Sequence, residues 1–455
     1  MKTRKIDMLH GPLAGKLVLF ALPLAVSSIL QQLFNSADLA VVGRFDSDQA
    51  MAAVGSNASL VNLIVSLFLG LSVGANVIVA RLIGQGKKEK INESIHTIVL
   101  IALISGVTIL TLGEVIAPQL LKLMNVPDDV FKLATTYLRI FFIAMPFIEI
   151  YDFGSAILRS KGDSSRPLYA LIASGIINVL LNLLLVIVFK LGVAGVAIAT
   201  VISNCVSASL ILYVLTHEEE TFRLDLRKLN MKKEYLLGVV KIGLPAGLQS
   251  MVFSLSNVVI QSAINTFGAD GIAGGTAAQN FEFMAYFVIN AFAQTATTFT
   301  SQNFAADDKE RCKKIYKLCT FIGLTSCFVL SGIFLLGRNV FIRIFSTDPG
   351  VIHYAMIRML VVCMFELLTG VYEISGGCLR GMGHSLQPAI ITVLGTCVFR
   401  LIWVATIYKL HRSYFILMLV YPASWVITGT AVTIAYFITR KKEFANMHKR
   451  KADII

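Results

Sequence analysis

The chain has 455 residues, of which 56% are hydrophobic and only 15% are charged, whereas a soluble domain carries about 25% charged residues. This composition excludes an ordinary soluble protein and indicates an integral membrane protein. The net charge of +13 does not indicate a nucleic-acid partner, because the Lys and Arg residues lie in short clusters between apolar segments.

About twelve apolar segments are long enough to cross a hydrocarbon core of about 30 Å. They are predicted at residues 14–43, 54–83, 93–121, 130–157, 167–189, 192–216, 235–266, 271–302, 316–337, 351–379, 386–409 and 414–439. An even number places both termini on one side. Lys and Arg are concentrated on that side, which predicts a multi-pass protein of the plasma (inner) membrane with both termini in the cytoplasm.

The first apolar segment contains a single carboxylate, Asp38, within the run QQLFNSAD. An ionised acid at membrane depth costs a few kcal/mol (about 3) on insertion scales. Asp38 is therefore predicted to bind a cation or a proton. The alternative is a structural ion pair with Arg44, about two helical turns away.

The fifth and sixth segments supply further oxygen donors. Asn178 and Asn182 are four residues apart, so they share one helix face. Such a pair serves either as glue between helices or as a ligand pair. Thr200, in the small-residue segment GVAGVAIAT, is predicted at a similar depth. A carboxylate, two amides and a hydroxyl are hard oxygen ligands that suit an alkali cation, and we predict a cation site at these four residues.

Other polar residues within the segments are candidates for substrate binding or proton transfer. Asp152 and Glu373 occupy matching places near the ends of the fourth and tenth segments, where pairing with arginines or solvation is the alternative. Glu282 lies among aromatic residues, with Tyr286 one turn later. An acid among aromatics can hold an organic cation, and an aromatic stripe in a core or facing lipid is the alternative.

The chain contains two copies of one design. The run LRSKGDSSRP at 158–167 returns as LRGMGHSLQP at 379–388, and Pro23 and Asn35 return as Pro245 and Asn257. Ile260 stands where Asp38 would recur. Each copy has six predicted segments, so the copies have the same orientation and are related by an axis along the membrane normal. The fold class is an all-α integral membrane protein with twelve transmembrane helices in two six-helix lobes. The predicted domains are an N-lobe (1–216), a cytoplasmic linker (217–234), a C-lobe (235–440) and a basic cytoplasmic tail (441–455).

No catalytic or cofactor motif accompanies these segments. The seven cysteines and seven histidines have no metal-ligand spacing, and no phosphate-binding glycine loop is present. We predict no cofactor, no metal beyond Na⁺ at the Asp38 site, no disulfide and no enzymatic activity.

Several motifs resemble the multidrug and toxic compound extrusion (MATE) family of secondary transporters. They are QQLFNSAD at 31–38, AAVGSN at 52–57, GQGKKEK at 84–90, GDSSRP at 162–167, GVAGVAIAT at 192–200, LPAGLQS at 244–250, QNFAADDKER at 302–311 and LRGMGHS at 379–385. The resemblance covers essentially the whole chain. It implies two six-helix lobes arranged as a V around a central cavity, and export of organic compounds against inward flow of Na⁺ or H⁺.

The resemblance also implies a role for particular residues. In the family the acid of the first helix forms a cation site with polar residues of the fifth and sixth helices, which carries over to Asp38, Asn178, Asn182 and Thr200. Some members have an aspartate where Asn182 stands. Other members have acids in the seventh and tenth helices, which align here near Phe253 and Thr369, so the C-lobe ion route of those members lacks its acids in this chain.

The predicted function is therefore a secondary antiporter that exports organic, cationic compounds in exchange for Na⁺ or H⁺. A flippase for a lipid-linked precursor is the first alternative, and a membrane-embedded enzyme is a weaker one. The expected partners are small organic substrates and membrane lipids, with no nucleic acid, and the expected state is a monomer. A site with one carboxylate and three neutral oxygen donors favours Na⁺ slightly over a proton.

Overall fold

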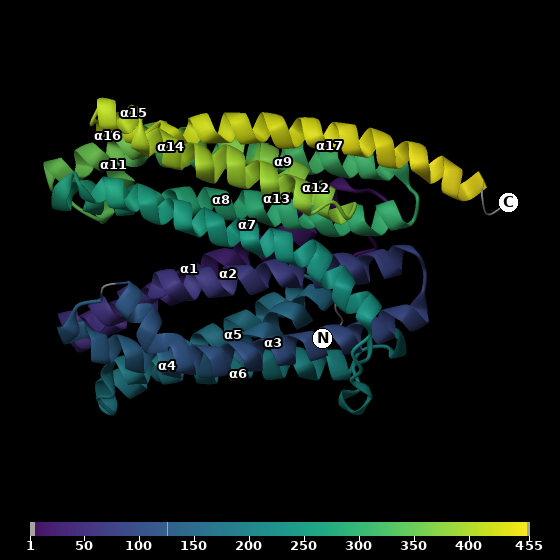
Figure 1. Cartoon of the computed structure of the whole chain (residues 1–455), viewed down its shortest axis with the longest axis horizontal. Helices are drawn as coiled ribbons and strands as arrows, with labels where there is room; N and C mark the ends of the chain where they lie inside the picture. The colour runs from purple at the N-terminus through teal and green to yellow at the C-terminus, as the bar shows by residue number, and fades with distance from the viewer. Residues whose placement is uncertain (1–4, 125, 453–455) are drawn as a thin grey trace. The chain divides into compact units, whose positions relative to one another are not determined.

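The computed structural model describes residues 5–124 and 126–452, and these residues form helices and connecting turns without any strand (Figure 1). The α-helices are α1 (Ala14–Phe45), α2 (Asp48–Gly84), α3 (Lys88–Leu123), α4 (Asp128–Ser160), α5 (Ser165–Asn182), α6 (Gly192–Thr216), α7 (Lys233–Asn265), α8 (Gly268–Ala305), α9 (Lys309–Leu336), α10 (Arg338–Phe341), α11 (Pro349–Val361), α12 (Leu367–Gly381), α13 (Leu386–Thr392), α14 (Phe399–Ala405), α15 (Ile407–Leu410), α16 (Tyr414–Met418) and α17 (Val420–Ala452). Two π-helices, η1 (Leu183–Val188) and η6 (Val393–Val398), continue α5 and α13. The 3₁₀ segments are η2 (Glu220–Phe222), η3 (Leu226–Lys228), η4 (Ile342–Ile344) and η5 (Cys363–Phe365).

Within the described residues, eleven helical stretches are long and apolar enough to cross a membrane. They correspond to eleven of the predicted segments. The remaining predicted segment, 271–302, lies in α8, which has the required length but carries many Thr, Gln and Asn residues. Large apolar side chains such as Leu180, Val188 and Leu336 are exposed along the helices, as expected where lipid rather than water surrounds the chain. The predicted all-α membrane fold is confirmed.

Several predicted segments differ from simple helices. The fifth contains the π-helix η1, the tenth is divided into α11 and α12 by η5, and the eleventh contains the π-helix η6. These interruptions change hydrogen bonding without changing hydropathy, so the apolar pattern carries no sign of them. The predicted tail from residue 441 is helical, because α17 continues through it to Ala452. Lys, Glu, Met and Ala are good helix formers. Residues 453–455 of that tail lie outside the described residues.

The chain forms two compact units. The first contains Val26–Leu244 with residues 5–6, and the second contains Asp7–Ala25 with the chain from Pro245 onward. Both α1 and α7 pass from one unit to the other beside a proline, Pro23 and Pro245 respectively. A proline inside a helix removes one backbone hydrogen bond and loosens the helix locally. The predicted lobe limits, which assign all of α1 to the N-lobe, remain a prediction.

Each unit is built around one central helix. In the first unit, α4 packs against α2, α3 and α6, and in the second unit α8 packs against α9, α11 and α12. Buried apolar residues between these helices form the cores, for example Ile98 and Phe153 in the first unit and Ala285 and Ile289 in the second. Burying a large apolar side chain such as Phe153 or Ile289 contributes about 1.5–3 kcal/mol.

The two copies end their fourth and tenth segments with the same glycine turn. Gly162 and Gly383 have φ angles of +97° and +92°, a region that glycine enters without a steric penalty. The next residue in each copy donates its backbone N–H to Leu158 or Leu379, at 3.0 and 2.9 Å, as in a Schellman cap. A Cβ atom at Gly162 would lie only 2.3 Å from the Ile6 carbonyl oxygen. This turn explains why the LRxxG motif occurs twice.

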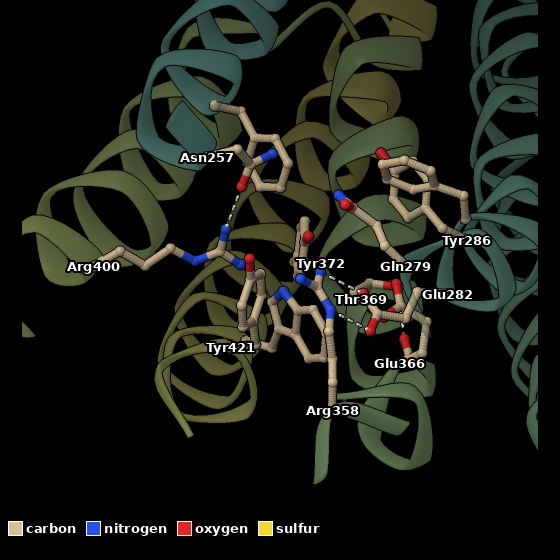
Figure 2. A pocket seen from close by; sticks show the side chains of 13 residues that line it. Asn257, Gln279, Glu282, Tyr286, Arg358, Glu366, Thr369, Tyr372, Arg400 and Tyr421 are labelled. Atoms are coloured by element: carbon tan, nitrogen blue, oxygen red, sulfur yellow. Dashed lines mark hydrogen bonds and ion pairs between the residues drawn. The ribbon is translucent and has the colours of Figure 1, made fainter. Parts of the chain in front are cut away.

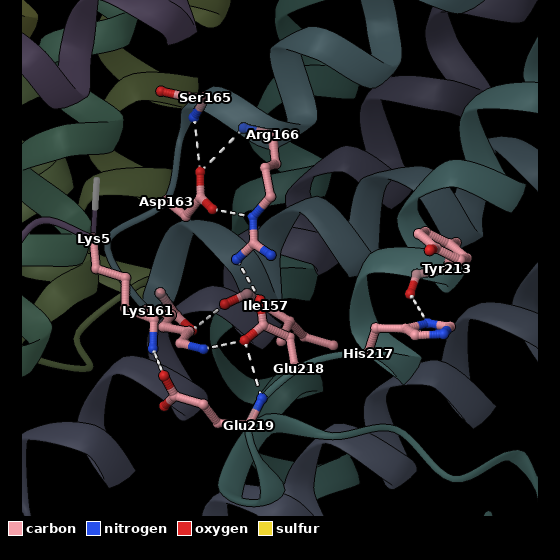
Figure 3. A network of polar contacts seen from close by, with 11 residues as sticks. Lys5, Ile157, Lys161, Asp163, Ser165, Arg166, Tyr213, His217, Glu218 and Glu219 are labelled. Carbon is pink, nitrogen blue, oxygen red and sulfur yellow. Dashed lines mark hydrogen bonds and ion pairs between the residues drawn. The ribbon is translucent and has the colours of Figure 1, made fainter. Parts of the chain in front are cut away.

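A network of charged side chains fixes this turn in the first unit (Figure 3). Lys161 bonds to Glu218, and Arg166 contacts both Asp163 and Glu218. Burial alone would raise the pKa of Glu218, but the hydrogen bond and charge of Lys161, together with Arg166, outweigh it and hold the pKa below its usual value. The network therefore ties the α4–α5 turn to the start of the linker.

Candidate functional site

The first unit contains a cavity of about 290 Å³. Its lining includes Asp38 and Asn35 from α1, Asp152 from α4, Asn178 from α5 and Thr200 from α6. These residues are far apart in the sequence, and the packing of α4 and α5 against α6 brings them to one place. Asp38, Asn178 and Thr200 were predicted to meet, and they line the same cavity.

Asp38 is held by the fifth helix rather than by a basic residue. Asn182 Nδ2 donates a hydrogen bond to Asp38 Oδ1 and a second one, of 3.2 Å, to Asn178 Oδ1. No ion pair joins Asp38 to Arg44 or to any other basic residue in the part of the chain that the structure describes. The carboxylate is therefore stabilised by a neutral amide, which leaves its charge available to an external cation.

The amide of Asn182 has an unused oxygen. Its side chain is only 1% exposed, and its Oδ1 atom has no hydrogen-bond partner among the described residues. A buried polar atom without a partner costs about 1–3 kcal/mol. Because the nitrogen of the same amide contacts the Asp38 carboxylate, this oxygen is a candidate ligand for a cation.

Thr200 and two neighbours on α6 complete the polar side of the cavity. The Thr200 hydroxyl donates to the Val196 carbonyl at 3.0 Å, so its lone pairs remain available as acceptors. Ser203 lies 3.5 Å from Asn178 Nδ2, and Asn204 also lines the cavity. Sequence reasoning did not select Ser203 or Asn204. Their spacing from Thr200 places all three within about one helical turn, which is the signal that could have found them.

The second unit contains a smaller cavity, of about 70 Å³, with four charged side chains in its lining (Figure 2). Arg358 donates two hydrogen bonds to Glu282, from Nε at 2.7 Å and from Nη2 at 2.9 Å. Both side chains are buried, with exposures of 2% and 7%. The Glu282 carboxylate, which the sequence suggested as a site for an organic cation, already has a cationic partner from within the chain.

The remaining predicted candidates separate into two groups. Tyr286 lines the second-unit cavity and its hydroxyl lies 3.5 Å from Glu373 Oε1, which brings two of the predicted residues together. Asp152, the counterpart of Glu373, lines the first-unit cavity instead. Phe253 and Thr369, near which the family resemblance aligned the acids of other members, both line the second-unit cavity.

Arg400 and Glu366 also line the second-unit cavity, and neither has an ion-pair partner among the described residues. Arg400 is completely buried. Its Nε donates to Ser424 at 3.2 Å, its Nη1 donates to Asn257 at 3.1 Å, and its guanidinium carbon lies 4.5 Å from the ring centre of Tyr421. Sequence reasoning selected neither residue as a site candidate.

The two copies of the chain match one family model. That model, described as MatE, covers residues 23–184 and again residues 245–406. The two matches confirm the predicted repeat, and together they include most of the chain.

Several similar proteins have names that refer to multidrug resistance. The probable multidrug resistance protein YoeA of Bacillus subtilis is 28% identical, over 82% of this chain and 82% of its own length. The probable multidrug resistance protein NorM of Thermotoga maritima is 26% identical, over 85% of this chain and 84% of its own length. A solved structure described as the outward-facing conformation of a multidrug resistance MATE family transporter of the MOP superfamily has a TM-score of 0.88, at 23% identity, and covers 99% of this chain and 100% of its own.

Proposed function

This chain belongs to the MatE family of membrane transporters, and from that membership we propose that it is a secondary active exporter. It exports organic, cationic compounds and takes up Na⁺ or H⁺ in exchange. It acts as a monomer in the plasma membrane with both termini in the cytoplasm. The relatives named as multidrug resistance proteins support export of several different compounds rather than one.

The proposal rests on Asp38 in the first-unit cavity. Asp38 has a hydrogen bond from a neutral amide and no ion pair among the described residues, so a bound cation would neutralise it. A site that gains a cation on one side of the membrane and loses it on the other supplies the coupling that an antiporter needs. Asp38 and Asp152 both line this cavity, which supports cationic rather than anionic substrates at this position.

We propose Na⁺ as the coupling ion. Asp38, Asn178, Asn182 and Thr200 offer one carboxylate and three neutral oxygen donors, which is a donor set for a hard cation. The unpartnered oxygen of Asn182, whose amide nitrogen bonds to Asp38, supports this choice, because a proton would need only the carboxylate.

Transport by the purified protein in liposomes tests the proposal. A fluorescent organic cation such as ethidium is loaded, and a Na⁺ gradient and a pH gradient are imposed separately. We expect the Na⁺ gradient to drive transport and Asp38→Asn to abolish it while the protein remains folded, because the amide cannot carry the charge. Asp308→Asn, at an exposed helix start, is the control. Normal gradient-driven transport by Asp38→Asn would refute the role of Asp38.

A flippase for a lipid-linked precursor is the alternative function. Phosphate groups are bound by several cationic donors, but among the described residues no Lys or Arg lines the first-unit cavity. This composition supports the exporter. Movement of a fluorescent phospholipid across the liposome bilayer, without export of ethidium, would favour the flippase.

A further inference from the structure

We propose that the second-unit cavity binds the carboxylate group of an aromatic compound, with Arg400 as its ligand. This inference rests on the proposed export function and extends its substrates to compounds that carry a carboxylate, whether anionic or zwitterionic. Three features of Arg400 support this inference: its place in the repeat, its unused donor and the charges around it.

Arg400 occupies the place in the second copy that Asn178 occupies in the first. Gly162 corresponds to Gly383 at the preceding turn, and a gapless comparison from there would pair Val179 with Arg400. The π-helix η6 lies between the turn and Arg400, and a π-turn accommodates one additional residue. With that residue inserted, Arg400 aligns with Asn178 in the repeat.

The contacts of Arg400 agree with this correspondence. Asn178 of α5 lies 3.5 Å from Ser203 of α6, and Arg400 likewise lies 3.2 Å from a serine of the next long helix of its own copy, Ser424 of α17. Asn35 lines the first-unit cavity together with Asn178, and its counterpart Asn257 accepts a hydrogen bond from Arg400. The two cavities are therefore equivalent places in the two copies.

The charges of these equivalent places are opposite. The first copy has Asp38 and a neutral Asn178, whereas the second copy has Ile260 and the positive Arg400. A place that suits a cation in the first unit thus suits an anion in the second.

Arg400 has a donor that no other group in the described chain uses. Its Nη2 atom is buried and has no hydrogen-bond partner among the described residues, although Nε is bonded to Ser424 and Nη1 is bonded to Asn257 (Figure 2). Leaving a charged donor unsatisfied in a buried place is costly. A carboxylate is the group that a guanidinium edge binds best, because two oxygens match two N–H donors.

The nearby charges limit the ligand to a single negative charge. Glu282 and Arg358 neutralise each other through two hydrogen bonds. Glu366 also lines the cavity without forming an ion pair among the described residues, so it repels an incoming anion whenever it is ionised. A phosphate dianion carries two negative charges and would be repelled about twice as strongly by Glu366 as a carboxylate, which carries one.

The cavity walls favour an aromatic carboxylate. Phe253, Tyr421 and Trp425 line the cavity beside Arg400, and the guanidinium lies 5.1 Å from the Phe253 ring centre. An aromatic ring attached to the carboxylate would pack against these faces.

Benzoate binding to the purified full chain tests the proposal, with Trp425 as the reporter. The chain has two tryptophans, and Trp403→Phe leaves only the one that lines the cavity. We expect benzoate to change the fluorescence of Trp425 with a saturable curve below about 10 mM, an ordinary range for a weak small ligand. Benzamide, which has the same shape without the charge, should cause no saturable change.

Variants then assign the effect to Arg400. Arg400→Gln should weaken benzoate binding about tenfold or more, because the charged donor is lost. Glu366→Gln should tighten binding severalfold, because it removes the repelling charge. If Arg400→Gln does not fold, Arg400→Lys keeps the charge but loses the paired donors, and should weaken binding severalfold. Asp38→Asn should leave benzoate binding unchanged.

These measurements separate this inference from the export proposal. Equal effects of benzoate and benzamide, the absence of saturable benzoate binding, or unchanged affinity in the Arg400 variant would each overturn the carboxylate site. Loss of export in Asp38→Asn together with any of these results would leave the export proposal standing. Benzoate binding that depends on Arg400, together with normal export by Asp38→Asn, would support the site and refute the coupling role of Asp38.

Discussion

Replacing Glu282 with glutamine should lower the free energy of unfolding by about 3–5 kcal/mol, the usual cost of removing one partner from a buried ion pair. Arg358 makes two hydrogen bonds to this carboxylate, at 2.7 and 2.9 Å, and is only 2% exposed. Without Glu282 its charge would remain in a place that water hardly reaches. The Tyr421 ring centre lies 5.5 Å from the Arg358 guanidinium carbon, and this cation–π contact offsets at most about 2 kcal/mol of that cost.

A double variant separates the cost of a lone charge from the value of the pair. Glu282→Gln together with Arg358→Met removes both charges, and we expect it to recover most of the lost stability, because an apolar replacement of a buried pair is often neutral. Glu310→Gln is the matched control. It breaks a 2.6 Å pair with Lys313 in which both side chains are exposed, and it should change stability little because water screens such pairs.

Thermal unfolding of the detergent-purified variants provides the measurement. The single Glu282 variant should unfold well below the wild-type temperature, the double variant close to it, and the Glu310 variant at it. If Glu282→Gln unfolds at the wild-type temperature, Arg358 does not depend on this carboxylate. If the double variant is as unstable as the single one, the loss arises from packing rather than from an unpaired charge.

Three further changes give distinct outcomes. Asn178→Ala should weaken the apparent Na⁺ affinity, measured from the rate of ethidium export, severalfold. An export rate that does not depend on Na⁺ concentration at fixed pH would contradict a sodium site. Gly162→Ala should lower the unfolding temperature more than Gly86→Ala does. Both glycines have a positive φ, but only at Gly162 would the added Cβ lie against a backbone oxygen. Equal decreases in unfolding temperature would count against that close contact. The wild type should be more stable than Glu218→Gln by the largest amount above a pH of about 4.5, the usual pKa of glutamate, and this difference should shrink at lower pH. The reason is that the pKa of Glu218 is lowered in the fold, so the carboxylate stabilises the fold only while it is ionised. A stability difference that does not change with pH would exclude the ion pair with Lys161 as the source of that difference.

The sequence alone determined the membrane fold, the repeat and the acid of the first helix. Hydropathy is a sum over about 20 neighbouring residues, so it located eleven of the membrane-spanning stretches without any tertiary information. The repeated LRxxG turn was visible because Gly162 and Gly383 both require a positive φ. Asp38 was visible because a single acid in an apolar segment is conspicuous wherever its neighbours lie.

Only the tertiary structure decided which charges meet. Glu282 and Arg358 are 76 residues apart, and nothing in their local sequences distinguishes a pair from two separate sites. The repeat aligns Arg400 with Asn178 once the π-helix η6 shifts the register by one residue, and that shift leaves the hydropathy unchanged. Side-chain pairing between helices depends on rotation and register at the scale of a single residue. Apolar segments determine depth in the membrane, but they leave this rotation to the packing of the folded chain.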